Sequence, residues 1–238
     1  ESGRSFREEP GNLERFFLPD IGALVVDGDQ GFPFTQLRDN AVRIRTLTFT
    51  LRATTDFAFP YANRVLSNFW LGGYLAIEHL LTCGAHRILI LTVPTPQRKH
   101  RPPTPPTEGR GSYLGRIVDG AITAMREGGG DPQRDLLQVT DDSPDTADNL
   151  RDGLRRGFDA IFCMGDVRAL RAYQAVTVMG AAVGRDVKVL GYFDTPWTSS
   201  FDPPLSSISI CEDEIGRRTA ETVCQQPTPT PTRSPPRR

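Results

Sequence analysis

The sequence lacks any apolar run that approaches the roughly 20 residues a membrane-spanning helix needs. Its first residues, ESGRSFREEPGNLERFF, are charged from the start and contain no signal-peptide core. An excess of positive charge is also lacking, because the formal net charge is −1, and this argues against a chain-wide basic surface for nucleic acid. We therefore expect a cytoplasmic protein with no membrane partner.

Cysteine is scarce, and its spacing suggests no bridge or metal site. Cys83, Cys163, Cys211 and Cys224 form no CxxC pair, and the three histidines lie at no metal-ligand spacing from them. We interpret these cysteines as small buried or half-buried hydrophobic residues rather than metal ligands or disulfide partners. This usage fits a reducing compartment and predicts no bound metal.

The motifs of the common enzyme classes are missing as well. The sequence has no GxSxG nucleophile elbow, no HExxH zinc motif and no Cys/His nucleophilic pair. Its one glycine run, at 128–130, lacks the spacing of a dinucleotide-binding loop and follows a predicted helix, so we interpret it as a plain loop. We predict no cofactor, no catalytic residue and no enzymatic activity.

What the sequence does contain is a strand–helix–strand unit over residues 158–192. Phe158–Met164 and Val187–Tyr192 are short apolar runs without alternation, which is typical of strands buried on both faces of a parallel sheet. Between them, Asp166 is predicted to cap a helix. The buried face of that helix is predicted at three-residue steps: Val167, Leu170, Tyr173, Val176 and Met179. Such units bind ligands at the carboxyl ends of their strands.

The same alternation extends over most of the chain. Patterns of apolar residues predict helices at 70–83, 112–127, 145–156 and 213–223, and strands at 21–27, 42–51, 65–66, 87–93, 136–140 and 205–210. Strands alternating with helices indicate an α/β fold with doubly wound parallel sheets. The proline-rich segments 94–107 and 225–238 hold almost no apolar side chains, and we predict that they are disordered.

Four segments carry a resemblance to a known family. SNFWLGGYLAIEHLLTCGAHRILIL (67–91) resembles a DN–x3–G–x4–EHL–x3–GHRRI stretch of LacI/GalR-type bacterial transcriptional regulators. FDAIFCMGDVRAL (158–170), GRDVKVLGYFDT (184–195) and PPLSSISICEDEIGRRTAETV (203–223) resemble three further motifs of these proteins, in the family's order and near its spacing. The match covers roughly residues 10–27 and 65–224.

The resemblance implies a periplasmic-binding-protein-like effector domain with two α/β lobes. Residues 1–67 together with 210–224 would form a partial N-terminal lobe. Residues 68–209 would form the C-terminal lobe, with a proline- and threonine-rich insert at 94–110, and 225–238 would be a disordered tail. Because Glu1 aligns with the second helix of the family, we expect the N-terminal lobe to be incomplete and the family's helix-turn-helix to be missing from this chain.

The resemblance also suggests a ligand site. Ser67 occupies the position of the aspartate in the family's DN motif. Phe193 occupies the position of the aspartate in the G-[FY]-D motif, which in the family often binds ligand hydroxyls, and Asp194 follows it. Arg116 lies one residue before the position of an effector-contacting arginine. Asp142 follows a predicted strand, where it could contact a polar ligand or belong to a solvated turn. We expect these five residues to line the site of a small effector between the two lobes.

The function implied by these features is effector sensing. The chain would bind a sugar, a nucleobase or a similar small molecule, form a homodimer in the intact protein, and act on DNA only through a domain missing from this chain. A solute-binding protein of a transporter, with the same fold, is the alternative. An α/β enzyme on a similar sheet is a more distant one.

Overall fold

The computed structural model describes residues 23–27, 46–51, 63–93, 113–141 and 145–225 of the 238-residue chain. By its internal contacts the chain divides into two compact units. The first consists of Glu1–Ser67 and Cys211–Arg238, and the second of Asn68–Ile210. The chain therefore crosses between the units twice, after Ser67 and after Ile210.

The second unit is built on a five-stranded sheet. Its strands are β4 (Ile88–Thr92), β5 (Leu136–Thr140), β6 (Ala160–Cys163), β7 (Lys188–Phe193) and β8 (Ser206–Ser209), in the order β5-β4-β6-β7-β8. Every pairing is parallel. All of β4 and β6 is buried, as the unbroken apolar runs ILILT and AIFC predict for strands covered on both faces. The predicted α/β class with parallel sheets is confirmed.

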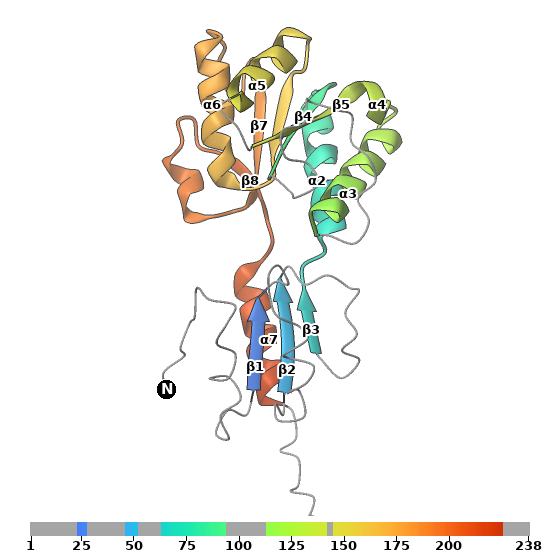
Figure 1. Ribbon diagram of the computed structural model, residues 1–238, viewed down its shortest axis with the longest axis vertical. Coiled ribbons are helices and arrows are strands. Elements are labelled where there is room, and N and C mark those ends of the chain that lie inside the picture. Colours follow the sequence, from blue (N-terminus) through green and yellow to red (C-terminus); the bar gives the residue numbers. More distant parts are fainter. Residues whose placement is uncertain (1–22, 28–45, 52–62, 94–112, 142–144, 226–238) are drawn as a thin grey trace, which may run out of the picture. The chain divides into compact units, whose positions relative to one another are not determined.

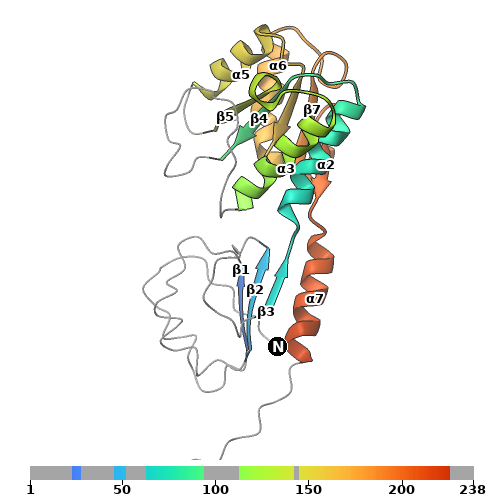
Figure 2. The same cartoon turned by 90° about the vertical axis from the view of Figure 1, so that its right-hand side faces the viewer.

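Helices cover both faces of this sheet (Figures 1 and 2). On one side lie α2 (Phe69–Thr82) and α3 (Tyr113–Glu127), and on the other lie α5 (Thr146–Arg155) and α6 (Ala169–Val178), while the short α4 (Pro132–Asp135) leads into β5. The asparagine Asn68 caps α2, because its side-chain oxygen accepts a hydrogen bond from the Leu71 amide at 3.1 Å.

Two glycines allow α2 and α3 to approach closely. A Cβ atom at Gly73 would lie 1.9 Å from the carbonyl oxygen of Ile117, and one at Gly120 would lie 1.9 Å from that of Trp70. Any side chain at either position would therefore meet the backbone of the facing helix. The glycines are a packing requirement of this helix pair.

The buried face of α6 differs from the prediction. Tyr173 and Val176 are buried as expected, but Val167 and Leu170 are 75% and 55% exposed, and Met179 also lies at the surface. The sheet is instead covered by the small residues of the helix: Ala169, Ala172 and Ala175. The small alanine side chains let the helix lie close to the strands. An α-helix has 3.6 residues per turn, so larger side chains spaced every three residues do not all remain on the face that packs against the sheet.

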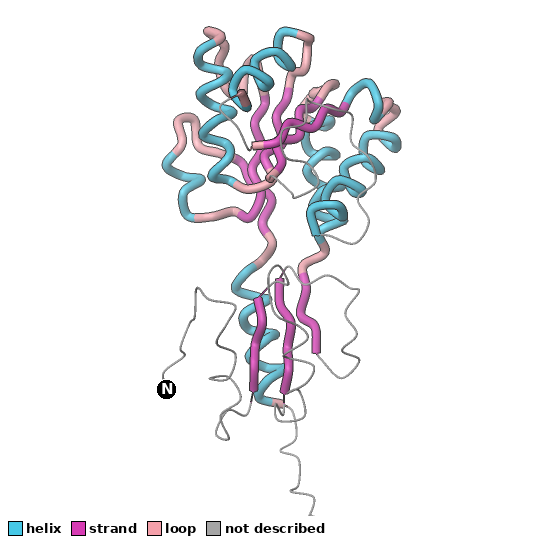
Figure 3. Tube along the Cα trace, in the orientation of Figure 1, coloured by secondary structure: helices cyan, strands magenta, loops and turns pink. Residues whose placement is uncertain are grey.

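The first unit contains a three-stranded sheet and one described helix (Figure 3). The strands β1 (Ala23–Asp27), β2 (Thr46–Leu51) and β3 (Asn63–Leu66) pair in parallel in the order β1-β2-β3. The helix α7 (Glu212–Cys224) contacts β2 and β3. The proline-rich segment 94–107 and, apart from Gln225, the segment 225–238 lie outside the described residues.

Candidate functional site

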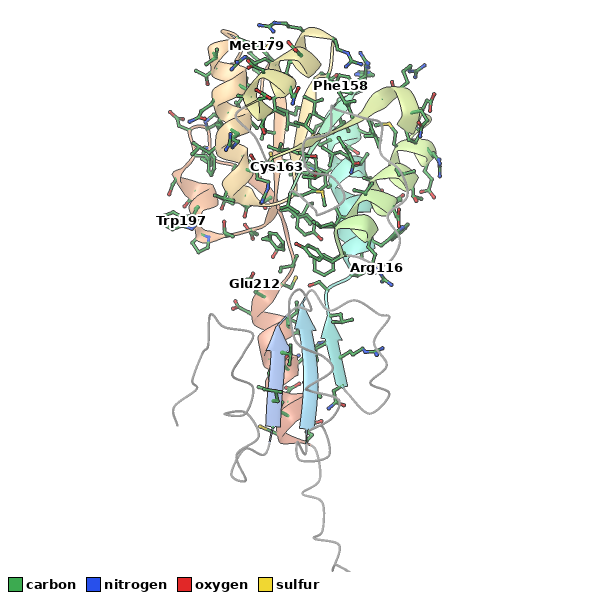
Figure 4. All side chains as sticks on the ribbon, in the orientation of Figure 1. Arg116, Phe158, Cys163, Met179, Trp197 and Glu212 are labelled. Carbon is green, nitrogen blue, oxygen red and sulfur yellow. The ribbon has the colours of Figure 1, made fainter. Side chains whose placement is uncertain are left out.

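Polar and aromatic residues follow the strands of the second unit at the carboxyl edge of its sheet. Asp141 comes directly after β5, the Gly165–Asp166 turn follows β6, and Asp194 and Thr195 follow β7. Figure 4 shows Arg116 and Trp197 at this end of the unit, whereas Phe158 and Met179 lie at the opposite end. In open parallel sheets this edge is where ligands bind.

Asp166, which follows β6, binds the segment after β7 and a residue within β8. Its Oδ2 atom accepts hydrogen bonds from the Thr195 backbone amide (2.7 Å) and the Thr195 hydroxyl (2.9 Å), and its Oδ1 atom accepts one from the Ser207 hydroxyl (2.6 Å). The side chain is buried, and all three donors are neutral groups. The prediction of a helix cap at this position is wrong, because no side-chain cap bond forms at the start of this helical segment.

The reach of Asp166 depends on Gly191 in β7. Gly191 pairs with Ser207 of β8, and a Cβ atom at Gly191 would lie 2.1 Å from Asp166 Oδ1 and 3.1 Å from Ser207 Oγ. Because Gly191 has no side chain, the Asp166 carboxylate can lie against β7 and reach Ser207 in β8. Ser207 continues the network, because its hydroxyl also accepts a hydrogen bond from the Asp194 amide at 3.0 Å.

The residues held by this network have an unusual backbone conformation. Phe193 has φ of 100° and Asp194 has φ of 56°, and neither is glycine. Positive φ values cost non-glycine residues free energy, and they persist where the surroundings fix them, often at ligand sites. Here the Asp194 amide and the Thr195 amide are both bound by the Asp166–Ser207 network. The network therefore holds the Phe193–Asp194 turn in place.

A second charged group lies beside the end of β6. Asp141 forms ion pairs with Arg171, whose Nε lies 2.8 Å from Oδ1, and with Arg168, whose Nε lies 3.6 Å from Oδ2. Within the described residues these contacts lack the alignment of hydrogen bonds, since Asp141 Oδ1 and Arg168 Nε are buried without a hydrogen-bond partner. Burial raises the pKa of the Cys163 thiol in this neighbourhood, so that cysteine is a neutral core residue.

The structure brings together some of the predicted site residues. Phe193 and Asp194 lie at the carboxyl edge, with Phe193 half-buried and Asp194 exposed. Arg116 is exposed in the first turn of α3 at the same end of the unit. Ser67 is the last residue of the first unit before α2, and Asp142 lies outside the described residues.

Sequence reasoning missed the Asp166–Thr195–Ser207 network and the Asp141–Arg168–Arg171 group. The signal for the first was available, since Asp166 and Thr195 both follow buried strands, but no spacing indicates that Gly191 opens a path between them. The prediction that the cysteines are buried or half-buried holds for Cys163 alone. Cys83, Cys211 and Cys224 are exposed, because they lie at or beyond helix ends, and none of the four cysteines forms a disulfide.

Two classes of site are not found among the described residues. No group of three or more His, Cys, Asp or Glu side chains there could hold a metal ion. In the same part of the chain, no helix combines the length and the apolar character that a membrane crossing would demand.

Comparison with known proteins identifies the family to which this chain belongs. A family model described as a periplasmic binding protein-like domain matches residues 77–238, and the chain belongs to this family. The ribose operon repressor of Haemophilus influenzae is 29% identical over an alignment of 176 positions, and the match covers 69% of this chain and 46% of that protein. The HTH-type transcriptional repressor PurR of Actinobacillus pleuropneumoniae is 25% identical over an alignment of 167 positions, and the match covers 67% of this chain and 44% of the repressor. The chain thus spans about half the length of the curated relatives it matches.

Solved structures show the same fold. A LacI family transcriptional regulator from Enterococcus faecium with bound ribose has a TM-score of 0.69 at 15% identity, covering 89% of this chain and 73% of that one. The Lac repressor dimer bound to operator has a TM-score of 0.67 at 20% identity, covering 91% and 70%. The predicted resemblance to LacI/GalR-type regulators and the periplasmic-binding-protein-like fold are confirmed.

Proposed function

We propose that this chain is the effector-sensing part of a LacI/GalR-type transcriptional regulator. The observation that carries the proposal is the Phe193–Asp194 turn, held at positive φ by Asp166 at the carboxyl edge of a parallel sheet. Backbone strain maintained by a dedicated buried network is typical of a site that has to be shaped before its ligand arrives. The repressors among the relatives support this assignment.

In this proposal the chain binds and releases a small molecule and catalyses nothing. Arg116, Phe193 and Asp194 would contact the effector, together with Ser67 and Asp142. A sugar, a nucleobase or a similar compound is the expected ligand, and ribose is one candidate because the Enterococcus faecium regulator holds it. The regulator would act as a homodimer in the cytoplasm and contact DNA through a domain outside this sequence.

A thermal-shift screen of the 238-residue chain with sugars, polyols and nucleobases tests this proposal. A ligand that binds only the folded state adds about 2.7 kcal/mol of stability at 100 times its dissociation constant. We expect Asp194→Ala and Arg116→Ala to remove most of this gain for the compound that binds. Arg126→Ala, at the other end of the same helix α3, is the matched control and should keep it. Undiminished stabilisation of both site variants would exclude the site.

A further inference from the structure

Two side chains that can bind a metal ion lie together at the end of α2, on the surface of the second unit. The Sγ atom of Cys83 is 3.6 Å from the Nε2 atom of His79, and both residues are exposed. His79 belongs to the last turn of α2 and Cys83 caps that helix, so the two residues are four positions apart. Two histidines bind zinc at the same spacing in an HExxH helix. The last turn of α2 therefore presents a sulfur and a nitrogen ligand side by side.

The distance between the two ligand atoms fits one shared zinc ion. Zinc binds cysteine sulfur at about 2.3 Å and histidine nitrogen at about 2.0–2.1 Å, usually in tetrahedral coordination. These bond lengths and a tetrahedral angle place the sulfur and the nitrogen about 3.5 Å apart. The observed separation is 3.6 Å, so the two atoms are already at the distance that a shared zinc ion requires.

The backbone holds the two residues at this spacing. The Cys83 amide donates a hydrogen bond to the His79 carbonyl at 2.9 Å, which closes the last turn of the helix between them. Beyond the cap, Gly84 has φ of 82°, and the amide of the buried Ala85 donates to the Leu80 carbonyl at 2.9 Å. This Schellman motif fixes the end of the helix. An ion would therefore meet a pair whose backbone is ordered in advance, which lowers the entropy cost of binding.

The surroundings of the pair favour a cation. Within the described residues, the side chains of His79 and Cys83 have each other as their one hydrogen-bond partner, so binding an ion disrupts no other contact there. The carboxyl end of a helix also carries a partial negative charge, which attracts positive ions. Both features act on the same exposed turn of α2.

We propose that His79 and Cys83 bind Zn²⁺, or a divalent cation of similar softness, at the end of α2. Thiolate sulfur and imidazole nitrogen both suit zinc. The ion takes the neutral imidazole and the thiolate, and the thiol proton passes to solvent. The part of the chain that the structure describes offers no group of three or more such side chains, so the other coordination positions stay open to water.

This site is separate from the candidate effector site. The helix α2 leads into the start of β4, so its last turn lies at the amino edge of the sheet, whereas the effector site is proposed at the carboxyl edge. The proposal goes beyond effector sensing and replaces our expectation, from cysteine spacing alone, that the chain binds no metal.

The first test is protection of thiols in the full 238-residue chain, reduced and stripped of metal beforehand. Iodoacetamide modifies accessible thiols, and mass spectrometry follows each cysteine separately. Cys83, Cys211 and Cys224 are all exposed, so all three should react without zinc. We expect Zn²⁺ to slow the modification of Cys83 at least about tenfold and to leave the other two within about twofold, because a metal-bound thiolate is not free to react.

Binding of Co²⁺ gives a second readout, because a cobalt–thiolate bond has a charge-transfer band that Zn²⁺ removes by displacing the weaker-binding ion. Cys83→Ser should abolish this band. His79→Gln should weaken Co²⁺ binding at least about tenfold, since even the loss of a group that only orients a metal ligand costs about that much. The matched control is Cys224→Ser, which should keep the band. Cys224 is also exposed at a helix end, but Ala220 stands four residues before it.

The outcomes decide the proposal. Protection of Cys83 alone, with loss of the cobalt band in Cys83→Ser, supports the site. Equal protection of all three exposed cysteines would mean unspecific thiol binding and would overturn it. A band that survives Cys83→Ser, or an affinity unchanged in His79→Gln, also overturns it. The protection experiment uses the unmodified chain, so it decides even if a variant fails to fold, and the effector screen tests the proposed function separately.

Discussion

The two sheets of this chain differ in how completely their strands are covered. In the second unit, β4, β6 and β7 each have a paired neighbour on both edges, and helices lie on both faces. In the first unit, among the described residues, β2 alone is paired on both edges, and Val25 of β1 is 47% exposed. Similar apolar strands therefore differ in how well they are protected from solvent, according to the strands and helices that surround them.

The described cores differ in the same direction. In the second unit, one cluster of buried residues joins the strands to α5, α6 and the segment before β8. The described residues of the first unit supply few buried apolar side chains: Leu24, Val26 and Ile215. In that unit the buried hydroxyls of Thr48 and Thr219 also have no hydrogen-bond partner among the described residues, and such groups cost stability. We infer that the second unit is the more stable one.

The largest expected effect comes from closing the gap between α2 and α3. Gly73→Ala would place a Cβ atom 1.9 Å from the backbone oxygen of Ile117, which no rotamer change relieves. Overpacking typically costs about 1–3 kcal/mol and more where backbone has to move, so we expect at least about 3 kcal/mol. Urea unfolding of the second unit, followed by circular dichroism, measures this loss.

The matched control lies in the first unit. Gly216 of α7 has open space around the position of a Cβ atom, so Gly216→Ala should stabilise its helix by about 0.5–1 kcal/mol. A comparable loss of stability from both substitutions would show that helix–helix distance does not explain the glycine in α2.

A truncation in each sheet measures the difference in coverage directly. Leu89→Ala in β4 removes a fully buried side chain and should cost about 2–5 kcal/mol. Val25→Ala in β1 removes an exposed one and should cost about 0.5 kcal/mol or less. Chemical denaturation of the two variants provides both values. Equal losses would mean that Val25 is covered in solution.

Hydrogen exchange compares the sheets without any substitution. Amides of Ile161–Cys163 in β6 are paired within a buried sheet, so they should exchange only when the second unit unfolds. Amides of Leu24–Val26 in β1 belong to the smaller sheet and should exchange on the order of a hundredfold faster. Mass spectrometry of a dilute sample tests this, and equal protection in the two strands would contradict the comparison.

Much of the second unit follows from its sequence, because its central strands β4 and β6 are apolar runs that are buried throughout. The strands predicted at 87–93 and 136–140 agree within one residue with the observed β4 and β5. Their ends could be predicted because the glycine and polar residues that end a strand are its neighbours in the sequence. The buried face of α6 could not be predicted in the same way. The larger side chains of α6 suggested one buried face. The face that packs against the sheet is instead the one that carries the alanines, because these small side chains let the helix lie closer to the strands.

The candidate site shows the same limit more sharply. Phe193 and Asp194 were predicted from the family resemblance, because they stand at and directly after the aspartate of the G-[FY]-D motif, and that motif lies within one segment of sequence. The network around Asp166 joins residues up to 41 positions apart, and it exists because Gly191 is opposite Ser207 in the sheet. Register between strands is set by tertiary packing, so this part of the site required the structure.

The smallest expected effect concerns charge on the surface of α7. Arg217 and Arg218 hydrogen-bond to Glu214 and lower its pKa from 4.5 to about 2. Because the pKa is lower in the folded chain, the pairing stabilises the helix above pH 4.5 and is lost as the pH falls toward 2. These contacts are solvent-exposed and local to one helix, so their contribution to stability should be small. It should weaken further at 1 M salt, where the Debye length is about 3 Å.

NMR titration of the Glu214 carboxyl group checks this prediction. Arg217→Gln should raise the pKa of Glu214 more than Arg218→Gln, because Arg217 donates two hydrogen bonds to it (2.7 and 2.8 Å) and Arg218 donates one (2.6 Å). Asp186 of the second unit, whose pKa Arg185 and the Ala182 amide lower to about 2, is the internal reference and should not respond to either variant. A Glu214 pKa near 4.5 in the unmodified chain, with the pKa of Asp186 still near 2, would contradict the prediction. It would mean that α7 is frayed, and that the two units differ in their surface ion pairs as well as in their cores.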